Sequence, residues 1–115
     1  MTYSAGPAAD IVGTVPVAFS WKHGEQEVDN TAVNLPDQEC AYCFLQNPST
    51  NGNNVYIGNS SSVSVPDATT DTNAGLELKP GDTSPPLACA NLNEWWAIAD
   101  AVDQSLVFMA ADHTG

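Results

Sequence analysis

The side chains able to do chemistry in this sequence are mainly carboxylates, and some of them stand close together. Asp100 and Asp103 form one such pair, and Glu25 and Glu27 form another. A glycosidase needs two carboxylates held across a cleft, one of them with a raised pKa. Both pairs fall in segments that we expect to be loops, and a chain of 115 residues is too small for a deep cleft. We therefore expect no glycosidase centre.

Other catalytic or ligand-binding patterns are also incomplete. Asp67 and Asp71 could offer oxygens to Ca²⁺ from one polar loop, but the full spacing of an EF-hand is absent. His23 and His113 have no serine or cysteine in the sequence that would suggest a triad. The glycines are isolated turn glycines, so no phosphate-binding loop is present. We expect a protein that is not an enzyme, with no catalytic residue, no metal ligand and no cofactor.

The three cysteines are Cys40, Cys43 and Cys89. Cys40 and Cys43 have the spacing of a metal or redox pair, yet no second pair and no nearby histidine completes a zinc site. They also lie in an apolar run typical of a strand, where alternation directs the two side chains to opposite faces. We expect small buried thiols in a β core. A single disulfide from Cys89 to Cys40 or to Cys43 stays open.

The charge of the chain is strongly one-sided. Fourteen acidic residues face two lysines, Lys22 and Lys79, and no arginine, for a net charge of −12. Such a chain cannot grip phosphates with guanidinium groups and is repelled by polyanions, so we expect neither nucleic acid nor a membrane as a partner. An excess of acidic residues commonly keeps a protein soluble, which is one interpretation. The more specific interpretation is that the acidic surface is complementary to a basic surface of a partner.

The amino terminus does not resemble a targeting segment. The first residues have no basic region followed by an apolar core, so they are not expected to be a signal peptide. Either the protein is made in the cytoplasm or a leader has already been removed. No apolar run approaches the roughly 20 residues that a membrane-spanning helix needs.

Alternation of apolar and polar residues predicts an all-β chain. Val15, Val17, Phe19 and Trp21 share one parity, which indicates a strand over 14–22 after an extended arm over 1–13. Residues 23–30 are expected to be an acidic loop. Further strands are expected at 31–35, 40–46, 55–57, 61–65, 75–78, 94–100 and 105–110, with 83–89 an edge strand or an irregular connection because of Pro85-Pro86. The fold expected is one β-sandwich or jelly-roll-like barrel of about eight short antiparallel strands, with an N-terminal arm and first strand over 1–22 and the sandwich domain over 23–115.

Residues 90–103 also fit a helix, since several apolar residues are spaced by three and four. Two adjacent tryptophans and Ile98 favour a strand instead. In that strand Trp96 shares its parity with Leu92 and Ile98, so we expect Trp96 in the core and Trp95 on the surface.

Several aromatic side chains are expected at the surface, where something must cover them. The strand over 40–46 places Cys43 and Leu45 on one face and Tyr42 and Phe44 on the other, and both faces are apolar. Exposed aromatic groups are enriched where proteins bind partners. The residues predicted to form a partner interface are Phe19, Trp21, Tyr42, Phe44 and Trp95.

An ordered series of short motifs runs through roughly the last two thirds of the chain. It comprises Gln46-Asn47-Pro48-Ser49, Asn54-Val55-Tyr56-Ile57-Gly58-Asn59, Gly75-Leu76-Glu77-Leu78-Lys79-Pro80-Gly81-Asp82, Asn91-Leu92-Asn93-Glu94-Trp95-Trp96-Ala97-Ile98-Ala99-Asp100 and a closing strand over 104–110. In this order the motifs resemble a small β-sandwich module of bacteriophage virion proteins, most closely head decoration (cement) proteins. The matching residues are turn and core residues, so the resemblance implies no catalytic residue.

The resemblance implies a structural virion protein on the outer surface of a capsid, made in the host cytoplasm. Such a protein would bridge neighbouring major capsid subunits and stabilise the shell, often as a homotrimer. The alternative is a tail- or fibre-associated module that binds another virion protein, or a host glycan through Trp95 or Tyr56.

Overall fold

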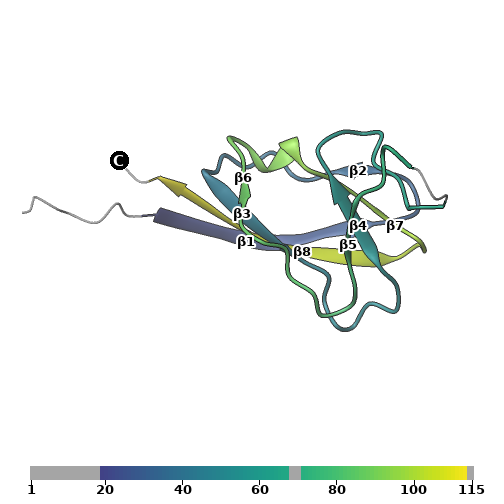
Figure 1. Cartoon of the computed structure of the whole chain (residues 1–115). Helices are drawn as coiled ribbons and strands as arrows, with labels where there is room; N and C mark the ends of the chain where they lie inside the picture. The colour runs from purple at the N-terminus through teal and green to yellow at the C-terminus, as the bar shows by residue number, and fades with distance from the viewer. Residues whose placement is uncertain (1–18, 68–70, 114–115) are drawn as a thin grey trace, which may run out of the picture.

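The computed structural model describes residues 19–67 and 71–113, which fold as a β-sandwich of two four-stranded antiparallel sheets (Figure 1). One sheet has the order β1-β8-β3-β6 and the other the order β2-β7-β4-β5. The strands are β1 (Phe19–Val28), β2 (Val33–Asn34), β3 (Tyr42–Gln46), β4 (Val55–Gly58), β5 (Leu76–Leu78), β6 (Leu87–Ala88), β7 (Trp96–Ala99) and β8 (Gln104–His113). The prediction of an all-β sandwich of about eight antiparallel strands is confirmed. The predicted arm lies outside the described residues.

β1 and β8 are the two longest strands and run side by side (Figure 1). They pair without interruption from Phe19 opposite His113 to Val28 opposite Gln104. The loop predicted over 23–30 is therefore wrong, and the proposed boundary after residue 22 falls within one strand. The acidic composition hid an alternation in which Glu25 and Glu27 are exposed and Val28 is buried.

Gly24 lies within this pairing at a position where a side chain would clash. It lies opposite Phe108, and a Cβ there would stand 2.9 Å from Cζ of that ring. The glycine therefore leaves room for the Phe108 ring to pack against β1. It does not end the strand, which continues to Val28.

The core lies between the two sheets. Cys43 and Leu45 of β3 are fully buried and Tyr42 and Phe44 are partly exposed, so the predicted division of this strand into two faces is confirmed. The core is completed mainly by Val28, Val55, Ile57, Leu78, Ala97, Ala99, Leu106, Phe108 and Ala110.

The predicted strand over 94–100 is present as β7, but its two faces are reversed. Ala97 and Ala99 are fully buried, Trp95 packs against the core, and Trp96 lies only half-buried on the opposite parity. A 3-10 helix (Leu92–Glu94) precedes the strand, so a count by twos cannot be carried across it from Leu92. Among the described residues this is the only helix, and none there is long and apolar enough to cross a bilayer.

Part of the outer face of the second sheet lies beneath the chain between β4 and β5. The strand predicted over 61–65 is wrong, since this segment forms only an isolated bridge between Ser64 and Ala74. Val63 is buried and lies over Gly75, where an added Cβ would come within 2.8 Å of its Cγ2. This cover leaves Tyr56 only 6% exposed.

A buried amide joins the turns at one end of the sandwich. Asn47, 0% exposed, follows β3 and donates from Nδ2 to the backbone oxygens of Asn53 (3.1 Å) and Leu78 (2.7 Å). The backbone N–H of Asn47 donates to the backbone oxygen of Asp82 (3.0 Å), and the backbone carbonyl of Asn47 accepts from the Gly81 N–H (2.7 Å). One side chain thus connects the ends of β3 and β5 with the turn before β4.

The cysteines behave as one pair and one buried thiol. Cys40 and Cys89 form a disulfide, with Cα atoms 6.2 Å apart, so the expectation of free thiols is wrong for these two residues and the open choice of partner for Cys89 falls on Cys40. Cys43 is fully buried, and its burial, with a smaller contribution from the Glu94 carboxylate, raises the pKa of the thiol from 9.0 to about 11.

We expect Cys43 to resist thiol reagents at neutral pH until the protein unfolds, because the thiolate is the reactive species. The folded pKa lies above the unfolded one, so this group supports folding below about pH 9 and loses that contribution as pH rises toward about 11. Two pKa units correspond to about 2 to 3 kcal/mol at the alkaline limit. Urea unfolding measured between about pH 9 and 11 checks the pH dependence, and Cys43→Ala should remove this part of the change in unfolding free energy with pH. Rapid labelling of Cys43 in the native protein at neutral pH would contradict the expected protection of the thiol.

Candidate partner interface

An aromatic cluster occupies the outer face of the first sheet. Tyr42 lies at its centre, with ring centroids 5.6 Å from Phe19, 5.8 Å from Trp21 and 5.8 Å from Phe44, all in edge-to-face geometry. Such geometry is the favoured one for aromatic pairs. Trp21 and Tyr42 both lie opposite Ala111 of the intervening β8, which is 0% exposed although it belongs to the outer face.

Two aliphatic residues of β8 extend this cluster. Met109 lies opposite Phe44 and Val107 opposite Gln46, so both belong to the outer face. We call this surface the aromatic face; it consists of Phe19, Trp21, Tyr42, Phe44, Val107 and Met109. An apolar hollow of about 240 Å³ lies at its edge, lined by Phe44, Gln46, Thr83, Val107, Phe108 and Met109.

Two residues of the aromatic face are exposed to solvent. Trp21 and Met109 are each 45% exposed, and the other four are partly buried. Contiguous exposed apolar surface in a soluble domain is typical of a site where another molecule docks. The aromatic rings of the face pack against one another edge to face.

Four of the five residues predicted for the interface meet on this face, and the fifth does not. Trp95 lies against the core, because the strand that follows it turns Ala97 and Ala99 inward. The sequence reasoning missed Met109 and Val107. The signal was available, since residues 105–110 carry apolar groups on both parities, as the strand over 40–46 does.

An acidic region lies at the other end of β1. Beyond Trp21 the outward residues of this strand are His23, Glu25 and Glu27, all exposed. Glu27, Asp29 and Asp103 have carboxylate oxygens within 4.8 Å of one another. Asp29 accepts a hydrogen bond from the Asp103 N–H (2.8 Å), and Asp103 has a left-handed backbone, with φ of 60°.

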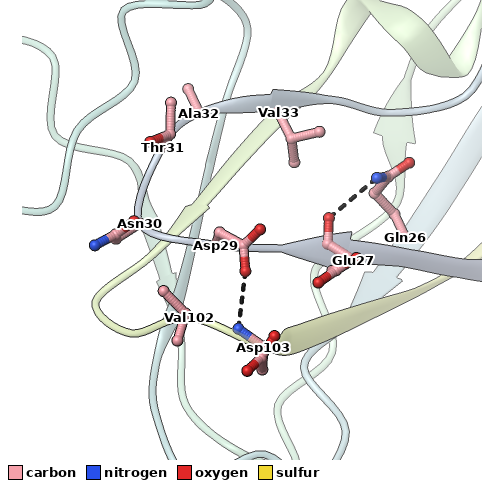
Figure 2. A pocket seen from close by; sticks show the side chains of 9 residues that line it. All are labelled: Gln26, Glu27, Asp29, Asn30, Thr31, Ala32, Val33, Val102 and Asp103. Carbon is pink, nitrogen blue, oxygen red and sulfur yellow. Dashed lines mark hydrogen bonds between the residues drawn. The ribbon is translucent and has the colours of Figure 1, made fainter.

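These acids border an open hollow of about 610 Å³, lined by Gln26, Glu27, Asp29, Asn30, Thr31, Ala32, Val33, Val102 and Asp103 (Figure 2). Figure 2 shows Val33 pointing from β2 toward β1 across it, with Asp29 and Asp103 on the opposite side. Neighbouring carboxylates repel one another and attract positive charge. The chemistry available here is electrostatic attraction of a cationic group.

The fold brings Glu27 of one acidic pair considered from the sequence close to Asp103 of the other, and adds Asp29 to them. Asp71 instead accepts hydrogen bonds from the Ser64 hydroxyl (2.7 Å) and the Asn73 N–H (3.0 Å), within its own loop. Among the described residues, neither Asp67 nor Asp71 belongs to a group of three close metal-ligand side chains.

The two rings considered for glycan stacking are largely covered. Tyr56 is 6% exposed beneath the segment that carries Val63, and its hydroxyl lies 3.5 Å from a Glu77 carboxylate oxygen. Trp95 packs against the core. The surface that remains open is the aromatic face with its acidic neighbour. No protein-family model, no curated protein and no solved structure matches the chain.

Proposed function

We propose that the chain is a non-enzymatic structural protein of a bacteriophage, which docks on the outer surface of the capsid and stabilises it. The observation that carries the proposal is the aromatic face, where Trp21 and Met109 are each 45% exposed beside three further aromatic rings. The ordered motifs that resemble virion modules supply the identity of the partner, the major capsid protein.

The energetics suit a cement protein. A stable protein–protein contact buries about 800 Å² on each partner, and aromatic residues near its centre dominate the binding energy. A chain that contacts two neighbouring shell subunits adds this buried area across their boundary and so opposes their separation. Assembly of the protein as a homotrimer would multiply the contacts and raise the overall avidity.

A tail- or fibre-associated module is the second candidate. The aromatic face suits a contact with another virion protein as well as one with a capsid subunit. The glycan-binding form of this candidate has less support, because Tyr56 is 6% exposed and Trp95 packs against the core.

The test is binding to empty heads of the phage that encodes the chain, measured by co-sedimentation and by the heat stability of the heads. We expect the wild-type protein to bind and to raise the temperature at which the heads open. Trp21→Ala and Met109→Ala together should weaken binding about 30-fold, which corresponds to about 2 kcal/mol. The matched control is Leu76→Ala, at an exposed apolar residue outside both the aromatic face and the acidic hollow that is 51% exposed.

The control variant should bind as the wild type does. A wild-type protein that neither binds the heads nor changes their heat stability would falsify the capsid role. Binding that is lost equally in the Trp21 and Met109 variant and in the Leu76 control would contradict the assignment to the aromatic face.

A further inference from the structure

β1 differs from every other strand at a sheet edge. Among the described strands, the edges are β1 with 10 residues, β2 with 2, β5 with 3 and β6 with 2. An edge strand leaves every second residue with an unpaired N–H and C=O, which can pair with another chain. Natural proteins protect such edges with short strands or prolines, as β6 is protected by its length and by Pro85-Pro86. β1 has neither of these two protections, although it carries one lysine and two glutamates and its Glu27 backbone oxygen accepts from the Gln26 side chain (3.0 Å).

The open edge of β1 borders the acidic hollow. The hollow lies between β1, at the edge of one sheet, and β2, at the edge of the other (Figure 2). Its lining combines the carboxylates of Glu27, Asp29 and Asp103 with the apolar side chains of Val33 and Val102. A lysine or arginine side chain has the same two parts, an aliphatic stem and a charged head.

The outward side chains of β1 change character along the strand. Trp21 belongs to the aromatic face, Glu25 is an exposed carboxylate farther along the strand, and Glu27 lines the hollow. Glu27 lies six positions after Trp21, which is about 20 Å in an extended strand. A chain lying beside β1 would therefore meet apolar surface at one end and carboxylates at the other.

We propose that the open edge of β1 accepts an extended segment of the partner as an additional strand. Apolar side chains of this segment lie beside Trp21, and a lysine or arginine lies beside Glu27 with its head in the acidic hollow. The identity of the partner rests on the proposed function; the edge and its chemistry do not. Charge disfavours a second copy as the occupant, because each chain carries −12 and β1 itself has two glutamates and one lysine.

The test uses the full chain and a synthetic peptide in which a terminal lysine is followed by alternating threonine and valine. NMR amide exchange follows β1 at millimolar peptide. In the free protein, we expect alternate amides between Trp21 and Val28 to exchange fast, since they lack a partner strand. The peptide should slow them about tenfold, whereas a peptide with glutamate in place of lysine should not.

Variants with matched charge changes locate the basic contact. Glu27→Lys should weaken the peptide about tenfold. Asp100→Lys makes the same change at an exposed residue outside β1 and the hollow, and should leave binding near the wild-type value. Equal effects of both variants would overturn the proposed position of the lysine or arginine.

Three other results would overturn the proposal: protected β1 amides in the free full-length chain, no response to the lysine peptide, or binding that leaves β1 exchange unchanged. None of these depends on phage heads. Loss of head binding in the Trp21 and Met109 variant, together with unchanged β1 exchange on the heads, would leave the docking face in place and remove only the added strand.

Discussion

Replacing Asn47 with alanine is expected to lower the free energy of unfolding by about 3 kcal/mol, since it leaves one buried and two partly buried polar groups without their partner. The Asn47 side chain donates to the backbone oxygens of Leu78 and Asn53, and its Oδ1 accepts from the side-chain Nδ2 of Asn51. Urea denaturation measures the loss. Asn59→Ala is the matched control, because Asn59 is exposed in the turn after β4.

The control should change stability by no more than about 0.5 kcal/mol, as surface substitutions usually do. An Asn47→Ala protein that is as stable as the control would show that water or backbone movement replaces the amide. That result would remove Asn47 as the residue that joins the turns.

Loss of the Cys40–Cys89 disulfide is expected to cost about 4 kcal/mol, since it releases a long loop of the unfolded chain. The two cysteines are 49 residues apart in sequence. The double variant Cys40→Ala with Cys89→Ala avoids new free thiols and is compared with the wild type in urea, each with and without reductant.

Reductant should destabilise the wild type and leave the double variant unchanged. A wild-type protein that is indifferent to reductant, or a double variant as stable as the oxidised wild type, would contradict the expected role of the bridge.

The sequence predicted those elements whose alternation is undisturbed. β3 and β4 follow directly from it, and so does the division of β3 into a core face and an aromatic face. Two of the predictions from the sequence that were wrong concern β1 and β7. Residues 23–30 were predicted to be a loop because many of them are acidic or polar, although they include Val28, which is buried at the end of β1. The faces of β7 were reversed because a 3-10 helix intervenes between Leu92 and Trp96.

The aromatic face was predictable as a set of side chains but not as a surface. Alternation placed Tyr42 and Phe44 together on one side of β3, whereas their proximity to Trp21 depends on β8 lying between β1 and β3. Strand order follows from long-range pairing, on which local patterns carry little information. The acidic hollow was hidden for the same reason, since Glu27 and Asp103 are distant in sequence and meet only when β1 and β8 pair.

The two edges of the first sheet differ, and this difference decides whether the sheet can be extended by further copies of the chain. A sheet that can pair at both edges can add copies without limit and form fibres. Here β6 is two residues long and follows directly on Pro85-Pro86, so this edge offers little for another strand to pair with. A strand that joins at β1, as proposed above, would therefore complete the sheet instead of starting a polymer.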